Sequence, residues 1–202
     1  MLSTALLLVL LAAATYTDVR WHKIYNSITY SGIVVALAVN GVAALLDSWT
    51  GELLVQVHWL VPIGIGLGDY FGGILGDGFA GLLICSFVMI VCFVFFPGGV
   101  GGGDVKLIAM MGAFLGTSAG LEAMLWTFIL GGATALIALV WHVGAVNLVA
   151  GVFRYVARVI RLHSFNAMTE QERQPFRTKL FLAPSALVAV VIVCIARLMA
   201  WW

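Results

Sequence analysis

Long apolar runs alternate with short polar segments along almost the whole chain. Six of these runs come close to the 20 or so residues that an α-helix needs to cross a hydrocarbon core about 30 Å thick. They are Leu2–Thr17, Ser27–Leu46, Phe79–Pro97, Val105–Leu121, Ala123–Val143 and Leu180–Ala200. The pattern predicts an all-α, polytopic membrane protein with about six transmembrane helices in a single membrane-embedded domain, residues 1–202.

A seventh, shorter apolar run and the first of the six have alternative interpretations. Leu53–Leu67 is shorter than the others and is interrupted by His58, Pro62 and glycines, so we expect it to lie in the interface without crossing the bilayer. The first run resembles the apolar part of a signal peptide but lacks the positively charged segment that precedes such a part. We therefore expect the first run to be a transmembrane helix.

The positions of basic residues predict the orientation. Arg20 and Lys23 follow the first run, Lys106 follows the glycine-rich loop, and six basic residues precede the last run. Residues 47–77 contain no lysine or arginine. With six spans and both termini outside, every basic cluster is cytoplasmic, as the positive-inside rule requires. This topology makes residues 47–77 approximately an outer loop and residues 144–179 approximately a basic cytoplasmic loop, in a multi-pass protein of the inner (cytoplasmic) membrane.

The amino-acid composition excludes several classes of function and site. The chain has 202 residues, of which 63% are hydrophobic and only 9% charged, against about 25% charged residues in ordinary soluble domains. A formal net charge of +1 gives no indication of a nucleic-acid partner. The three cysteines form no CxxC pair and the four histidines have no ligand spacing, so the sequence predicts no disulfide, metal or other cofactor.

Two aspartates stand at predicted helix ends on the cytoplasmic side. Asp18 follows the first run, and Asp104 precedes the apolar part of the fourth. Ionisable residues at membrane depth suggest a functional site. Two carboxylates that share a site do not both ionise easily, so one can act as a base on a water molecule while the other donates a proton. Taken separately, however, Asp104 is better explained as a helix cap and Asp18 as the end of a span.

The segment before Asp104 reads GGVGGG (98–103), which lets the backbone approach a partner closely. A phosphate-binding loop is excluded, because such a loop needs Lys-Ser or Lys-Thr after its last glycine, where this chain has Asp104-Val105.

Two stretches resemble the type IV prepilin peptidases, which are intramembrane aspartic proteases with a GxGD motif. GGGDVKLIAMMGAFLG (101–116) resembles their GxGD region, and TDVRWHKIYNSIT (17–29) is similar to their first aspartate site. Tyr25 stands where the family usually has proline. The resemblance implies that Asp18 and Asp104 are catalytic, with motif support from Gly101, Gly103, Lys106 and Asn26.

Several of these residues also have simpler explanations. Lys106 can be an inner-face anchor of its span, and Asn26 can hydrogen-bond the loop or cap the second span, the cap being favoured. Glu122 is interpreted as an outer-surface cap. Gly66-Leu67-Gly68-Asp69 is a second formal GxGD, but it lacks the following Val-Lys-Leu and, like Asp77, lies on the outer side of the predicted topology.

The resemblance implies an endopeptidase that removes the basic leader from pilin-like precursors at the cytoplasmic membrane face. Its partners are then these precursors and the lipid bilayer. The chain is most similar to short family members, as in tight-adherence (Flp-type) pilus or archaeal preflagellin systems, so we expect no methyltransferase activity. A small carrier or channel using intramembrane carboxylates is the main alternative, although its acids would be expected near the bilayer midplane. A non-catalytic scaffold is a third possibility.

Overall fold

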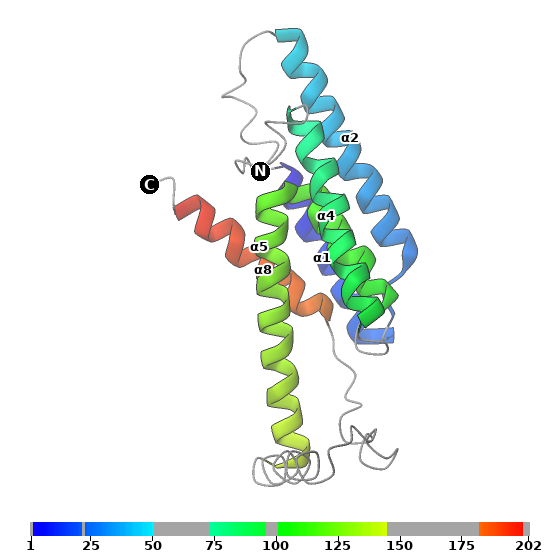
Figure 1. Ribbon diagram of the computed structural model, residues 1–202, viewed down its shortest axis with the longest axis vertical. Coiled ribbons are helices and arrows are strands. Elements are labelled where there is room, and N and C mark those ends of the chain that lie inside the picture. Colours follow the sequence, from blue (N-terminus) through cyan, green and yellow to red (C-terminus); the bar gives the residue numbers. More distant parts are fainter. Residues whose placement is uncertain (1, 22, 51–72, 96–100, 145–181, 200–202) are drawn as a thin grey trace. The chain divides into compact units, whose positions relative to one another are not determined.

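The computed structural model describes residues 2–21, 23–50, 73–95, 101–144 and 182–199. Every regular element among them is an α-helix, as Figure 1 shows, which confirms the predicted all-α class. The helices are α1 (Leu2–Trp21), α2 (Asn26–Thr50), α4 (Gly73–Phe95), α5 (Gly102–Val143) and α8 (Leu182–Met199).

The described helices are those of a membrane protein. By length and composition, three segments are long and apolar enough to cross a bilayer, namely Ser3–Trp21, Gly76–Phe95 and Gly102–Trp141, the last of which contains a break in the helix at Gly116. Asn26–Val42 and Leu182–Arg197 are shorter apolar helices. The count of six spans and the outside location of both termini stay predictions. Leu53–Leu67, Asp69 and almost all of the predicted basic loop lie outside the described residues.

The chain divides into two compact units, residues 1–128 with 181–202 and residues 129–180. The first unit contains α1, α2, α4, the beginning of α5, and α8. Within it, α1 packs against both α2 and α8, while α2 packs against α4. Of the second unit the structure describes residues 129–144, which include the end of α5. All the candidate site residues belong to the first unit.

The first part of α5 is the centre of the first unit. Residues 107–117 are all buried, with no exposed position in three turns of helix. A helix that is apolar on every side is expected to be surrounded by other helices. Glycines allow this close packing: a Cβ on Gly32 of α2 would collide with Met110, and one on Gly81 of α4 would collide with the backbone of Gly112.

α5 is broken at Gly116, which has φ 76° and ψ −172°. A Cβ added to Gly120 would lie 3.0 Å from the Cα of Gly112, although eight residues of straight helix would separate the two positions by about 12 Å. The chain therefore folds back on itself at Gly116. The predicted boundary between spans ending at Leu121 and beginning at Ala123 was wrong, because the left-handed conformation of one glycine reverses the chain five residues earlier.

Glu122 is correspondingly not a cap. It lies inside the second part of α5, where its Oε2 is 3.3 Å from the Arg197 guanidinium of α8. The same guanidinium lies 3.4 Å from the Ser118 hydroxyl. The residue interpreted as an outer-surface cap thus has an ion-pair partner on a neighbouring helix.

Two polar side chains replace the hydrogen bond that is missing at the break. In a continuous helix the Thr117 N–H would donate to the Ala113 carbonyl. Here the Thr117 N–H donates to Asp77 Oδ1 of α4 at 3.1 Å, and the Thr117 hydroxyl donates to the same oxygen at 2.6 Å. The Ala113 carbonyl accepts from Asn40 Nδ2 of α2 at 3.0 Å. Both backbone groups that the break separates are therefore satisfied from neighbouring helices, as an apolar environment requires.

Asn40→Leu is expected to destabilise the protein by about 1–3 kcal/mol, because it leaves a buried carbonyl without its donor. The measurement is the midpoint of thermal unfolding in detergent, followed by tryptophan fluorescence. Ser31→Ala on the same helix is the control, since the exposed Ser31 hydroxyl bonds only within α2 and its loss should cost less than about 0.5 kcal/mol. Equal midpoints for the two variants would contradict the role given to Asn40.

Candidate active site

α1 carries Asp18 on its inward face. The buried positions of this helix recur every three or four residues and lie on one side of it. They include Ser3, Leu7, Leu11, Ala14 and Asp18. Asp18 is only 9% exposed, and the residues that follow it to the end of α1 are exposed. The carboxylate therefore ends the buried stripe of α1 and is directed into the first unit.

The first turn of α5 carries Asp104. The Gly101 carbonyl accepts from the backbone N–H groups of Asp104 at 3.0 Å and Val105 at 3.3 Å, which makes Gly101 the N-cap residue. The Gly101 N–H in turn donates to Asp104 Oδ2 at 3.0 Å, which is the reciprocal half of a capping box. Asp104 is therefore not the N-cap residue itself, but its side chain caps the helix from the third position. Its second carboxylate oxygen is not used in this bond.

The fold brings Asp18 and Asp104 together. The two carboxyl groups are close enough for the charge of Asp18 to act on that of Asp104. Asp77 lies elsewhere: its partner Thr117 is 13 residues beyond Asp104 on the same chain, or about 20 Å of helical rise. A carboxylate pair of this kind suits general acid–base chemistry on a polar bond. Within the described residues no cluster of three or more His, Cys, Asp and Glu side chains is placed to hold a metal ion.

The three glycines before Asp104 have different surroundings. A Cβ on Gly103 would lie 3.2 Å from the Cβ of Ile24, which belongs to the segment between α1 and α2. A Cβ on Gly101 would lie 3.0 Å from Asp104 Oδ2. A Cβ on Gly102 would meet nothing within 4 Å. The GxG pattern therefore has a physical basis, because the outer two glycines leave room for Ile24 and for the carboxylate while the middle position is open.

Lys106 and Asn26 are bonded to each other. Lys106 Nζ of α5 donates to Asn26 Oδ1 of α2 at 2.7 Å and lies 4.9 Å from the centre of the Tyr30 ring. The favoured role of Asn26 as a cap was wrong. Tyr25 is the N-cap residue of α2, because its carbonyl accepts from the Ile28 N–H at 3.1 Å. Asn26 is one residue inside the helix, and its side-chain oxygen is taken by Lys106.

Sequence reasoning missed an aromatic cluster at the end of α1. The Tyr16 and Trp21 rings meet edge to face at 5.8 Å between centroids, and the Trp21 and Tyr25 rings meet similarly at 6.1 Å. All three rings are about half exposed or more. The spacing of these three aromatic residues, five and then four positions apart, is the sequence feature that could have predicted the cluster. Through the Trp21 and Tyr25 rings, the end of α1 contacts the N-cap residue of α2.

Comparison with known families identifies the chain. The model of the type IV leader peptidase family matches residues 5–136, a segment that contains both aspartates and the residues bonded around them. The chain belongs to this family. It is an aspartic-type endopeptidase of the kind that removes leader peptides from prepilins. No curated protein and no solved structure matches the chain.

The family assignment favours the peptidase over the carrier or channel interpretation. It also gives a context for the two stretches that carry the resemblance, because residues 17–29 and 101–116 both fall within the matched segment. In this type IV leader peptidase the two stretches meet through Ile24 with Gly103 and through Asn26 with Lys106.

Substitutions at Gly103 and Gly102 are expected to differ in their effect on leader cleavage. Gly103→Ala should lower the rate several-fold and Gly103→Val should lower it further, because the added side chain displaces Ile24 and with it the segment that follows Asp18. Gly102→Ala and Gly102→Val are matched controls that enter open space. The rates can be measured by mass spectrometry of a co-expressed pilin-like precursor. A larger loss at position 102 than at position 103 would refute the explanation of the motif.

Proposed function

We propose that Asp18 and Asp104 are the catalytic pair of this type IV leader peptidase. The observation that carries the proposal is that the fold places Asp18, at the end of α1, near enough to Asp104, in the first turn of α5, for their charges to interact. Further support comes from the match of both residues to the family's motifs. Asp77 is a poor candidate, since its Oδ1 is committed to Thr117 at the far end of the central helix.

The pair performs hydrolysis by sharing one proton. The ionised carboxylate takes a proton from a water molecule, whose oxygen attacks the carbonyl carbon of the scissile peptide bond. The protonated carboxyl group donates its proton to the carbonyl oxygen, which gives a tetrahedral diol. When the C–N bond breaks, the first carboxyl group gives the proton that it took from water to the departing nitrogen. The second carboxylate takes a proton from one hydroxyl of the diol, which forms the new carboxylic acid and returns both aspartates to their starting states. This sequence requires no covalent intermediate.

Asp18→Asn and Asp104→Asn should each lower the rate of leader cleavage by at least about 100-fold, because each removes one partner of the acid–base pair. Asp77→Asn is the matched control and should keep substantial activity, since an amide oxygen can still accept a hydrogen bond from Thr117. Membrane insertion, measured from the amount of protein in the membrane fraction, should be unchanged in all three. Full processing by either of the first two variants would eliminate the proposed pair.

We infer that catalysis takes place at the cytoplasmic face of a six-span protein with both termini outside. The support is the distribution of charge: Arg20, Lys23 and Lys106 lie near the carboxylate pair in the sequence, whereas residues 47–77 contain no basic residue. The basic leader of a pilin-like precursor remains on the same side in this orientation. The cleavage site then lies where the leader meets the precursor's hydrophobic helix.

Single cysteines test this orientation without any activity measurement. In a background with alanine at positions 85, 92 and 194, Ser48→Cys should react with a membrane-impermeant thiol reagent in intact cells, because it is placed outside. Ser164→Cys should react only after lysis, because it is placed in the cytoplasm. Labelling of both positions in intact cells would mean that Leu53–Leu67 crosses the membrane and that the six-span topology is wrong.

Pilin-like precursors of tight-adherence (Flp-type) systems are the proposed substrates. The basis is the resemblance of the chain to the family members of these systems. Co-expression with such a precursor, and in parallel with a precursor of a different pilus type, would show the preference from the mass of the processed product. The inner membrane is the proposed location.

A further inference from the structure

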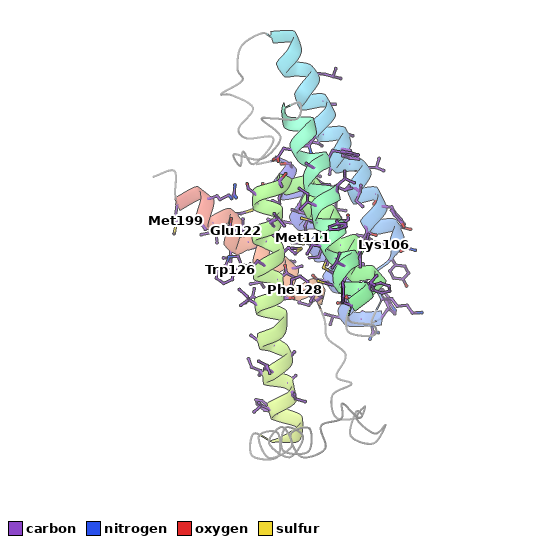
Figure 2. The ribbon with its side chains drawn as sticks, viewed as in Figure 1. Lys106, Met111, Glu122, Trp126, Phe128 and Met199 are labelled. Carbon is purple, nitrogen blue, oxygen red and sulfur yellow. The ribbon has the colours of Figure 1, made fainter. Side chains whose placement is uncertain are left out.

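Lys106 connects two helices at the carboxylate pair. Its ammonium group donates to Asn26 Oδ1 at 2.7 Å and lies over the face of the Tyr30 ring, 4.9 Å from its centre. Both partners are in the first two turns of α2, whereas Lys106 is in the second turn of α5. Figure 2 shows the labelled Lys106 next to the start of α2. The lysine is therefore held by two different interactions, one through its donor and one through its charge.

The side chains of Lys106 and Asp104 point in different directions. Residues two apart on a helix do not face each other. Asp104 Oδ2 is directed back to the Gly101 N–H, while Lys106 Nζ is directed to α2. Lys106 is thus placed to fix the position of α2 and is not aimed at the Asp104 carboxylate.

A second contact lies nearby on the same chain segment. Ile24, two residues before Asn26, packs against Gly103 at the start of α5. The contacts of Ile24 and Asn26 both join the segment after α1 to the first two turns of α5. Asp18 lies in the last turn of α1, directly before this segment. Its position relative to Asp104 therefore depends on these contacts.

We propose that Lys106 is a positioning residue of the peptidase, which sets the separation of the Asp18 and Asp104 carboxylates by holding Asn26 and the Tyr30 ring against α5. The proposal rests on the catalytic role proposed for the two aspartates. It assigns Lys106 no proton transfer and no contact with the substrate. A misplacement of about 1 Å at a catalytic pair can lower a rate about 100-fold, so a residue of this kind has a measurable effect on turnover.

The first test compares Lys106→Met with Lys106→Arg. The methionine keeps the apolar stem but loses the donor and the charge, so kcat should fall about 10–100-fold. Because substrate contacts are unchanged, KM should stay within about twofold. Arginine can still donate to Asn26 and stack on Tyr30, and it should restore most of kcat. Lys23→Met, the same change at an exposed lysine in the segment between α1 and α2, is the control and should leave kcat near that of the parent.

The partner residue gives a double-mutant cycle. Asn26→Leu should lower kcat about as much as Lys106→Met, and the double variant should lose little more than either single one, because both remove the same bond. Additive losses would overturn the proposal, as would an effect confined to KM or a failure of arginine to restore turnover.

A cross-linking measurement separates positioning from catalysis and from folding. In the background with alanine at positions 85, 92 and 194, the variant Asp18→Cys with Asp104→Cys is treated in membranes with a short bifunctional thiol reagent. Adding Lys106→Met should lower the cross-linked fraction, whereas adding Lys23→Met should not. An unchanged fraction would refute the positioning role even if both aspartates prove catalytic. Full activity of Asp18→Asn or Asp104→Asn would refute the proposed catalytic pair alone, since the cross-linking result does not depend on turnover.

Discussion

The structure depends on one constraint: a chain that reverses direction among apolar helices must still pair its backbone groups. The break at Gly116 separates the Ala113 carbonyl from the Thr117 N–H, and Asn40 and Asp77 supply the missing partners from two other helices. This arrangement lets the helix of residues 102–115, about four turns long, be buried on all sides from residue 107 onward. Because that helix begins with the GGGD sequence, the carboxylate of Asp104 is placed at the end of the most tightly packed element of the first unit.

The candidate site is assembled from one side of this central helix. α1 delivers Asp18 at the end of a buried stripe, and the segment after it contacts the first turns of α5 through Ile24 and Asn26. The position of the carboxylate pair is thus determined by side chains that take no part in the chemistry. Such supporting contacts generally decide whether reactive groups are held in a productive arrangement. The polar groups at the Gly116 break and those at the aspartate pair occupy opposite ends of the same helix and perform different tasks.

Much of this could be predicted from the sequence. Apart from the break at Gly116, the apolar runs predicted the ends of the described helices to within about four residues, except the start of α4, which lies six residues before the predicted Phe79. The glycines with the following aspartate indicated the site. The inward direction of Asp18 was also available, since the stripe from Ser3 to Asp18 has helical spacing. The break could not be predicted, because nothing local distinguishes the conformation of one glycine among 23. The bond between Lys106 and Asn26 joins residues 80 positions apart, and only the packing of α2 on α5 reveals it.

The shortness of the central helix has a consequence for the membrane around the enzyme. Residues 102–115 rise only about 21 Å, whereas the hydrocarbon layer of a typical bilayer is about 30 Å thick. The two ends of such a helix cannot both reach the headgroups of an undisturbed bilayer, even without tilt. Either the lipid layer is thinner beside this part of the protein, or one polar end lies several ångströms below the headgroups. If that end is the one with the two aspartates, the water that hydrolyses the leader must reach them through a polar passage in the protein or a local depression of the membrane surface.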